Sequence, residues 1–170
     1  MNEVLTRWNE LESAVGACEI RACCGSSAWA AGMVSGRPFR EEISLLSAAD
    51  KIWKSLEEED WLEAFKSHPK IGGSRASIDP GAGSAGWSEQ EQKDVASAND
   101  EIKAKLADGN RAYEEKFGFI FIVCATGKSA AEILAILERR LQNGKETELQ
   151  EAAEEQRQIT QLRLKKWLGI

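Results

Sequence analysis

The chain has 170 residues, of which 42% are apolar and 29% are charged, and its formal net charge is −6. These values predict one globular domain over residues 1–170 with a sizeable buried core, and they exclude a disordered chain. The basic residues are scattered along an acidic chain, which excludes a general nucleic-acid-binding protein. No apolar run approaches the roughly 18 residues that a membrane-spanning helix needs, so a membrane partner is not expected.

The cysteines indicate a reducing environment. Cys18, Cys23, Cys24 and Cys124 fit neither a disulfide framework nor the ligand spacing of a zinc site. The polar, acidic start of the chain predicts no secretory signal peptide, so the protein is not expected to be secreted. Residues 168–170 differ from the Ser-Lys-Leu signal of peroxisomal proteins.

The first half of the chain predicts consecutive helices. Asn2 to about Ala14 forms a short amphipathic pattern, and Cys18 to Val34 alternates small and apolar residues. A stronger helix is predicted from about Glu41 to Leu56 because apolar residues recur every three or four positions, which indicates a buried stripe: Ile43, Leu46, Ala49, Ile52, Trp53 and Leu56. A second helix is expected from about Glu59 to Ser67.

In the second half, Gly72 to Gly86 predicts a surface loop because it is rich in glycine and serine. One long helix is expected from about Glu89 to Ala107. The apolar run Phe117 to Ala125 resembles a strand, but no other segment offers it a partner, so we expect a buried extended segment. Helices from Ser129 to about Gln142 and from about Lys145 to Leu168 complete the chain, with a stop at Asn143-Gly144 between them.

These patterns predict an all-α fold, a single-domain helical bundle of about seven to nine helices with one short extended segment. The sequence contains no internal repeat.

His68 is the only histidine and the first candidate for proton chemistry. An unperturbed imidazole has a pKa of about 6.5 and can take or give a proton near neutrality. A lone histidine is more often structural than catalytic. Pro69, however, disfavours a helical conformation at His68, which indicates a ring at a helix end beside the glycine-rich loop.

Ser88-Glu89-Gln90-Glu91-Gln92 has both a structural and a functional interpretation. Ser88 and Glu91 have the spacing of a capping box, which alone explains the pattern. A helix N-terminus also attracts anions, and Gln92 adds an amide that can bind a polar ligand. Because this segment and His68 flank the same loop, folding of the loop can bring them together.

Arg163 is the third candidate, since helical spacing places Ile159, Arg163 and Trp167 on one face. Most arginines are solvated, with the stem packed on neighbours. A guanidinium on an apolar stripe needs a partner, and an anionic ligand would serve. The run Phe119 to Ala125 is core by default, but unpaired backbone groups there would also suit an amide-rich ligand.

Together these fragments resemble the 2-oxo-4-hydroxy-4-carboxy-5-ureidoimidazoline (OHCU) decarboxylases, the final enzymes of urate degradation to S-allantoin. Each fragment alone is weak, whereas their ordered set along nearly the whole chain is specific. Residues 23–27 and the run 119–122 are especially similar to the decarboxylase half of plant allantoin synthases, in which a transthyretin-like hydrolase domain follows. The matching fragments are Arg37-Pro38-Phe39, Asp60 to Phe65, His68 to Gly72, Ser88-x-x-Glu91-Gln92, Phe117 to Ala125, Glu138 to Asn143 and Ile159 to Leu164.

The resemblance implies a homodimeric carboxy-lyase without cofactor or metal that converts the small molecule OHCU to S-allantoin and CO2. It implies that His68 and Glu91 are catalytic. It implies that the substrate is bound by Pro69, Ser88, Gln92, Arg163 and the backbone of Phe121, Ile122, Val123, Cys124 and Ala125. One departure is at Thr126-Gly127-Lys128, where many relatives have an arginine at or near this position.

The plant resemblance also implies a peroxisomal location, with the cytoplasm as the other compartment. It further implies fusion to, or action with, a transthyretin-like 5-hydroxyisourate hydrolase.

Two other functions remain open at this stage. One is a helical module that binds a purine-derived anion or a partner helix without turnover, which saturation binding without product would reveal. The other is an amidohydrolase of ureido compounds, which would release ammonia rather than CO2. The latter is disfavoured because no metal cluster, serine or cysteine is evidently paired with His68.

Overall fold

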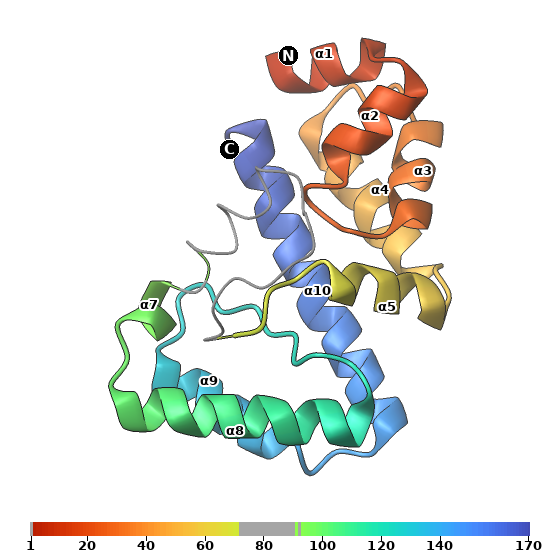
Figure 1. The fold of residues 1–170 in the computed structure, drawn as a ribbon. Helices are drawn as coiled ribbons and strands as arrows, with labels where there is room; N and C mark the ends of the chain where they lie inside the picture. Colours follow the sequence, from red (N-terminus) through yellow and green to blue (C-terminus); the bar gives the residue numbers. More distant parts are fainter. Residues whose placement is uncertain (1, 72–90, 92) are drawn as a thin grey trace. The chain divides into compact units, whose positions relative to one another are not determined.

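The computed structural model describes residues 2–71, 91 and 93–170, most of which are helical (Figure 1). This part of the chain contains no β-strand, so the predicted all-α class is confirmed. None of its helices is both long and apolar enough to cross a membrane. The internal contacts divide the chain into two compact units, Met1–Ala64 with Arg157–Ile170 and Phe65–Gln156. The assignment of residues 1–170 to one functional domain stays a prediction.

The first unit contains α1 (Glu3–Glu10), α2 (Ser13–Ile20), α3 (Ser27–Ser35), α4 (Glu42–Lys54), most of α5 (Glu58–Lys66) and the second half of α10 (Lys145–Leu168). Side-chain oxygens cap two of these helices, Asn2 at Leu5 N (3.1 Å) and Ser26 at Trp29 N (3.2 Å). The core of this unit consists mainly of large apolar side chains: Leu5, Trp8, Ile20, Trp29, Met33, Leu45 and Leu164.

The prediction of one helix over residues 2–14 is wrong, because the chain turns at Leu11 between α1 and α2. Arg37 accounts for this break. Its Nη1 atom donates to the carbonyl oxygens of Trp8 (2.7 Å) and Leu11 (2.9 Å). The Trp8 carbonyl also accepts from Leu11 N (3.3 Å), and both carbonyls lie in the last turn, where a helix lacks its regular backbone donors. A distant arginine therefore stabilises the end of α1.

The predicted helix at residues 41–56 is confirmed as α4, but one member of its expected stripe is wrong. Ile43 is 67% exposed, whereas Leu45 is completely buried. Ile43 lies in the first turn of α4, ahead of the buried residues Leu45, Leu46, Ala49 and Trp53. A periodic sequence pattern fixes the buried face of a helix less well at its first turn than in its middle.

The second unit contains α7 (Lys93–Ala96), α8 (Asp100–Phe117), α9 (Ala130–Arg140) and the first half of α10. The predicted single helix at residues 89–107 is wrong. Asn99 begins a new helix by accepting a hydrogen bond from Ile102 N (2.9 Å), so α7 and α8 are separate. The helix α8 then continues to Phe117 and ends at Gly118, whose left-handed backbone (φ 82°) suits glycine.

The middle of α8 contains Asp108-Gly109-Asn110, which has the composition of a turn but is helical. A Cβ atom at Gly109 would lie 2.7 Å from Leu137 Cδ2 of α9, so glycine permits the close approach of these two helices. The buried Asn110 side chain donates to the carbonyl of Ile71 (2.9 Å). Both residues therefore serve tertiary contacts rather than a turn.

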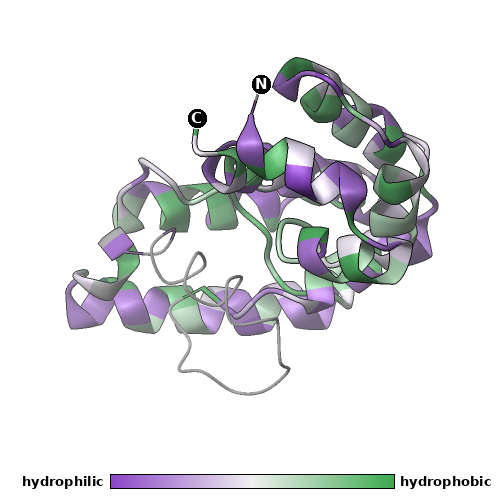
Figure 2. Cartoon of the chain, turned by 90° about the horizontal axis from the view of Figure 1, so that it is seen from above, coloured by the Kyte–Doolittle hydropathy of each residue, from purple (hydrophilic) through white to green (hydrophobic). Residues whose placement is uncertain are grey.

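Between α8 and α9 the chain runs back along α8 as an extended segment, as predicted (Figure 1). Figure 2 shows that this segment is hydrophobic along its length, whereas hydrophilic and hydrophobic residues alternate along α8. The ring of Tyr113 contacts those of Phe117 (4.7 Å), Phe119 (5.7 Å) and Phe121 (5.3 Å between centroids). These aromatic contacts bury Phe121 to Ala125 against α8 and α9.

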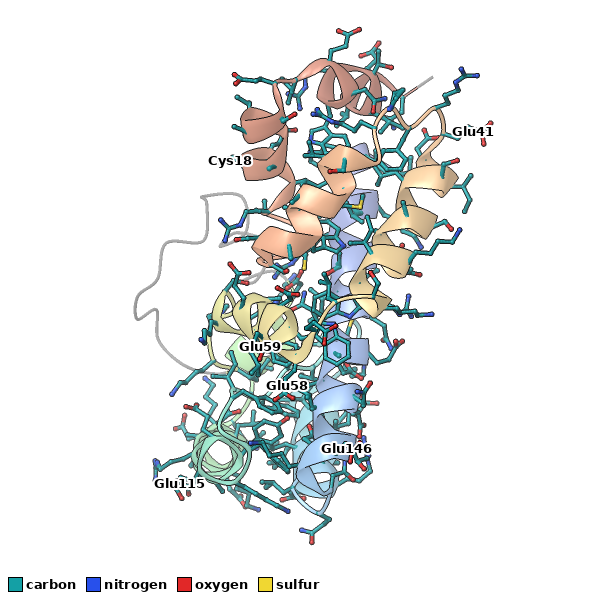
Figure 3. The ribbon with its side chains drawn as sticks, turned by 90° about the vertical axis from the view of Figure 1, so that its right-hand side faces the viewer. Cys18, Glu41, Glu58, Glu59, Glu115 and Glu146 are labelled. Atoms are coloured by element: carbon teal, nitrogen blue, oxygen red, sulfur yellow. The ribbon has the colours of Figure 1, made fainter. Side chains whose placement is uncertain are left out.

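Charged groups at helix ends complement this packing. Figure 3 shows Glu115 on the outer side of α8, away from the aromatic rings. Glu58 and Glu59 lie in the first turn of α5 and Glu146 in that of α10, where carboxylates stabilise the positive end of the helix dipole. The predicted cap of α9 is confirmed as a complete capping box, in which Ser129 Oγ accepts from Glu132 N (3.2 Å) and Ser129 N donates to Glu132 Oε2 (2.7 Å).

Candidate functional site

His68 lies just after the end of α5, where the sequence places it. Its backbone N–H donates to the carbonyl of Phe65 (3.2 Å), which extends the helix by one tight turn. Its half-buried ring contacts α10, with Nε2 2.7 Å from Oε1 of the fully buried Gln156. A hydrogen bond to a buried helical residue fixes the ring better than a solvated loop would.

The residues that follow His68 are attached to α8. Pro69 and Lys70 are exposed, and Lys70 Nζ pairs with Glu114 Oε1 at 2.8 Å. Ile71 is buried and its carbonyl accepts the hydrogen bond from Asn110. The predicted loop at 72–86 and the predicted site residues Ser88 and Gln92 lie outside the described residues.

The extended segment has one edge whose backbone groups are bonded to side chains of the same unit. Cys124 N donates to Glu155 Oε2 (2.6 Å), and Cys124 O accepts from Lys128 Nζ (2.6 Å). The carbonyl of Ile122 accepts from Arg140 Nη1 (2.6 Å). In an extended chain, residues two apart present their N–H and C=O groups to the same edge. Ile122 and Cys124 therefore share the bonded edge.

The opposite edge carries the N–H and C=O groups of Val123. This residue is 4% exposed, and among the described residues its two backbone groups have no hydrogen-bonding partner. Buried backbone groups almost always bond to something, because leaving them unpaired costs free energy. The Val123 edge is thus suited to a ligand that offers both donors and acceptors.

A buried ionic cluster holds the bonded edge in place. Arg140 and Glu148 are completely buried and form an ion pair, with Arg140 Nε 2.7 Å from Glu148 Oε1. The hydroxyl of Tyr113 also bonds to Glu148, and the guanidinium of Arg140 lies 4.8 Å from the centroid of the Phe121 ring. Burial raises the pKa of Tyr113 well above its ordinary value, so its hydroxyl remains a donor. The cluster therefore positions the carbonyl of Ile122.

Glu91 lies within the electrostatic reach of the same segment. Burial raises the pKa of the Cys124 thiol, the Lys128 ammonium opposes this rise, and the carboxylates of Glu155 and Glu91 add to it. The Glu91 carboxylate is thus close enough to Cys124 for its charge to act on the thiol. Within residues 65–156, His68 and the extended segment therefore contact adjacent residues of α10, Gln156 and Glu155, while the position of Glu91 relative to His68 stays a prediction.

Arg163 belongs to the other unit, and its position relative to His68 stays a prediction. The residue is 2% exposed, which agrees with the apolar stripe predicted for this helix face. Its guanidinium lowers the pKa values of Cys23 and Cys24, but burial outweighs it and raises that of Cys24 to about 11. These two thiols are therefore neutral near pH 7.

The sequence analysis missed several residues that shape this site, above all Gln156. A signal for Gln156 was present, because the face that carries Ile159, Arg163 and Trp167 continues to residue 156 by helical spacing. The roles of Glu155 and Arg140 had no local signal, since their backbone partners Cys124 and Ile122 are 31 and 18 residues away. Within the described part of the chain, no three histidine, cysteine or carboxylate side chains are grouped to hold a metal ion.

The chain is similar to known proteins over most of its length. A family model described as OHCU decarboxylase matches residues 9–165. The Arabidopsis thaliana protein named uric acid degradation bifunctional protein TTL is 39% identical over 153 residues, which cover 89% of this chain and 47% of that protein. The chain thus spans about half the length of this relative.

Two further relatives match over most of their own length. The protein of Amia calva named 2-oxo-4-hydroxy-4-carboxy-5-ureidoimidazoline decarboxylase is 34% identical, and the match covers 79% of this chain and 77% of that protein. The crystal structure of an OHCU decarboxylase in the presence of (S)-allantoin superimposes with a TM-score of 0.77 and 36% identity, covering 90% of this chain and 99% of the other. With a family match from residue 9 to residue 165 and an identity of 34% to a relative matched over most of its length, this chain belongs to the OHCU decarboxylase family.

Proposed function

We propose that the chain decarboxylates 2-oxo-4-hydroxy-4-carboxy-5-ureidoimidazoline to S-allantoin and CO2, in the degradation of urate. Family membership supports this reaction. The observation that carries the proposal is the buried backbone edge at Val123, which has no hydrogen-bonding partner among the described residues and lies in the same unit as a histidine held by Gln156 and the carboxylate of Glu91. Such a site offers a ureido ring both hydrogen-bonding groups and proton-transfer groups.

The proposed substrate contains its own electron sink. Loss of CO2 from C4 leaves an electron pair on that carbon, which the neighbouring C5=N unit and the ring delocalise. The pair then forms a C4=C5 double bond while the nitrogen of the C5=N unit takes up a proton. The protein has to orient the carboxylate for departure and, as the 4-hydroxyl group loses its proton to become a carbonyl, deliver a proton to one face of C5. A pocket that exposes only one ring face to the proton donor would give a single enantiomer.

In this proposal, His68 takes the proton of the 4-hydroxyl group or handles the proton delivered to C5, while Glu91 holds the hydroxyl and the imidazole. A well-placed acid or base contributes about 10²–10⁴-fold to the rate. The hydrogen bond between His68 Nε2 and the Gln156 amide oxygen, together with the tight turn at Phe65, supports a fixed ring, as this role requires.

Substrate binding is assigned to the remaining predicted residues. The ureido and ring amides would bond to the backbone of Phe121 to Ala125, above all to the Val123 edge, and Pro69, Ser88 and Gln92 would complete the polar contacts. Arg163 would balance the negative charge of the substrate, which is a positioning and electrostatic role.

The proposal is tested by supplying freshly made substrate and following the circular dichroism of S-allantoin. The wild-type chain should produce optically active allantoin, and His68→Asn should nearly abolish it while the helical signal stays unchanged. A wild-type chain that binds the substrate without turnover, or releases ammonia instead of CO2, would refute the proposed reaction.

A second variant separates a catalytic from a structural role of Glu91. A cap at a helix N-terminus contributes about 1 kcal/mol, so a purely structural Glu91→Gln change would lower stability by that amount and leave turnover intact. We expect instead a large fall in turnover. Glu101→Gln, the same change at an exposed position in α8, serves as the matched control.

Assembly and location are also proposals. We propose a homodimer, to be measured by sedimentation, and action with or fusion to a transthyretin-like 5-hydroxyisourate hydrolase, which relatives described as bifunctional support. A peroxisomal location, with the cytoplasm as the alternative, rests on the plant resemblance and is tested by imaging a fluorescent fusion.

A further inference from the structure

We propose that Gln156 is a positioning residue that fixes the tautomer of His68, with the proton on Nε2 and the basic lone pair on Nδ1. The inference starts from the contact between His68 Nε2 and Gln156 Oε1, at 2.7 Å. An amide oxygen only accepts hydrogen bonds, so a hydrogen bond at this distance requires a proton on Nε2.

The location of Gln156 keeps its amide oxygen fixed next to His68 Nε2. Its side chain has no exposed area, and it lies well inside α10, eleven residues after the helix begins at Lys145. The neighbouring Glu155 is bonded to Cys124 N, so the same turn of α10 is attached to the extended segment. Because the Gln156 amide is buried on an anchored helix turn, water does not replace its oxygen as the hydrogen-bonding partner of His68 Nε2. At an exposed side chain, such replacement occurs readily.

The consequence for catalysis rests on the proposed function. In a neutral imidazole one nitrogen is a donor and the other an acceptor, and the bond made by the first determines which nitrogen takes up a proton. With Nε2 bonded to Gln156, Nδ1 is the atom through which His68 acts as a base. Gln156 thus acts on the substrate only through the orientation and tautomer of the ring.

The single histidine of the chain makes the tautomer directly measurable. In a ¹⁵N-labelled protein, long-range ¹H–¹⁵N correlation shows two imidazole nitrogens, recorded at a pH where titration finds the ring neutral. The wild type should show a protonated Nε2 and an unprotonated Nδ1. Gln156→Met removes the acceptor, so both nitrogen shifts should move toward exchange-averaged values. Gln156→Glu, which also only accepts when ionised, should keep the wild-type pattern.

Gln150→Met is the matched control, because it makes the same change at an exposed position of the same helix and should leave the spectrum unchanged. A wild-type ring protonated on Nδ1, or nitrogen shifts that Gln156→Met does not alter, would overturn the inference. If Gln156→Met does not fold, the wild-type and Gln156→Glu spectra still decide between the two tautomers.

The kinetic part of the test separates this inference from the proposed reaction. Loss of a residue that orients a functional histidine typically costs about 10–100-fold, so Gln156→Met should lower kcat by that factor with little change in KM. An unchanged kcat would contradict the positioning role. A wild-type chain without decarboxylase activity would refute the proposed function, while the nitrogen spectra would still test the tautomer.

Discussion

Replacement of Arg140 by methionine should destabilise the protein far more than the same change at the next-door Arg139. Both residues lie at the end of α9 and each pairs with a glutamate of α10. Arg140 and Glu148 have no exposed side-chain area, whereas the side chain of Arg139 is 58% exposed. Burial, rather than the number of ion pairs, is therefore the variable in this comparison.

The expected losses of stability depend on the surroundings of the glutamate that loses its arginine partner. Arg140→Met leaves the Glu148 carboxylate buried without its countercharge and removes the donor to Ile122 O, and breaking a buried pair in this way costs about 3–5 kcal/mol. In a chain of this size each 1 kcal/mol lowers Tm by about 2–4 °C, so Tm should fall by about 6–20 °C. Arg139→Met removes a largely solvated partner and should cost about 0–1 kcal/mol.

Thermal and urea unfolding followed by far-ultraviolet circular dichroism measures both variants. The double variant Arg140→Met, Glu148→Leu buries no charge, so it should recover much of the stability lost in the single variant. Equal losses for Arg139→Met and Arg140→Met would refute the argument, and so would a double variant no more stable than Arg140→Met alone.

The other predictions concern a cap, the thiols and alkaline pH. Ser129→Ala should lower the unfolding free energy by about 1 kcal/mol, because it removes the hydroxyl that accepts from Glu132 N; a loss below about 0.3 kcal/mol in urea titration would show that the cap contributes little. With a thiol-specific reagent near neutral pH, the exposed Cys18 should react at once, while Cys124 should react only after unfolding; equally fast labelling of Cys124 would contradict its burial. Because folding raises the pKa of Cys24 from 9.0 to about 11, the unfolded chain loses this proton first as pH rises. The stability from this group is therefore complete below about pH 9 and falls by about 2–3 kcal/mol towards pH 11, a decline that Cys24→Ala should reduce and that a pH-independent wild-type stability would rule out.

The sequence was most informative where local chemistry decides the structure. Ser129 and Asn143-Gly144 predicted a helix between them that reaches about Gln142, and α9 begins after Ser129 and ends at Arg140, because caps and stops act through neighbouring residues. The run 117–125 resembles a strand but has no partner strand elsewhere in the sequence, and this predicted an extended segment. By contrast, Gly109 and Asn110 look like a turn, and only their contacts with Leu137 and Ile71 explain why α8 continues through them.

In the candidate site, too, a residue with a local sequence signal was predictable, whereas its distant partners were not. His68 was predictable because one histidine stands at a helix end before a proline. Its partner Gln156 is 88 residues away, and the acceptor of the Cys124 amide, Glu155, is 31 residues from it. Such partners arise from the packing of α10, which no short stretch of sequence specifies. The positions of Glu91 and Arg163 relative to His68 stay predictions.

The alternating backbone edges of the extended segment make its hydrogen-bonding pattern depend on whether its length changes by an odd or an even number of residues. Side chains of Arg140, Glu155 and Lys128 hold the groups of Ile122 and Cys124, which leaves Val123 facing the other way. One residue inserted after Gly118 would shift the segment by half a strand repeat and exchange the two edges, whereas two inserted residues would restore the original orientation. An engineered loop here should therefore tolerate changes in steps of two.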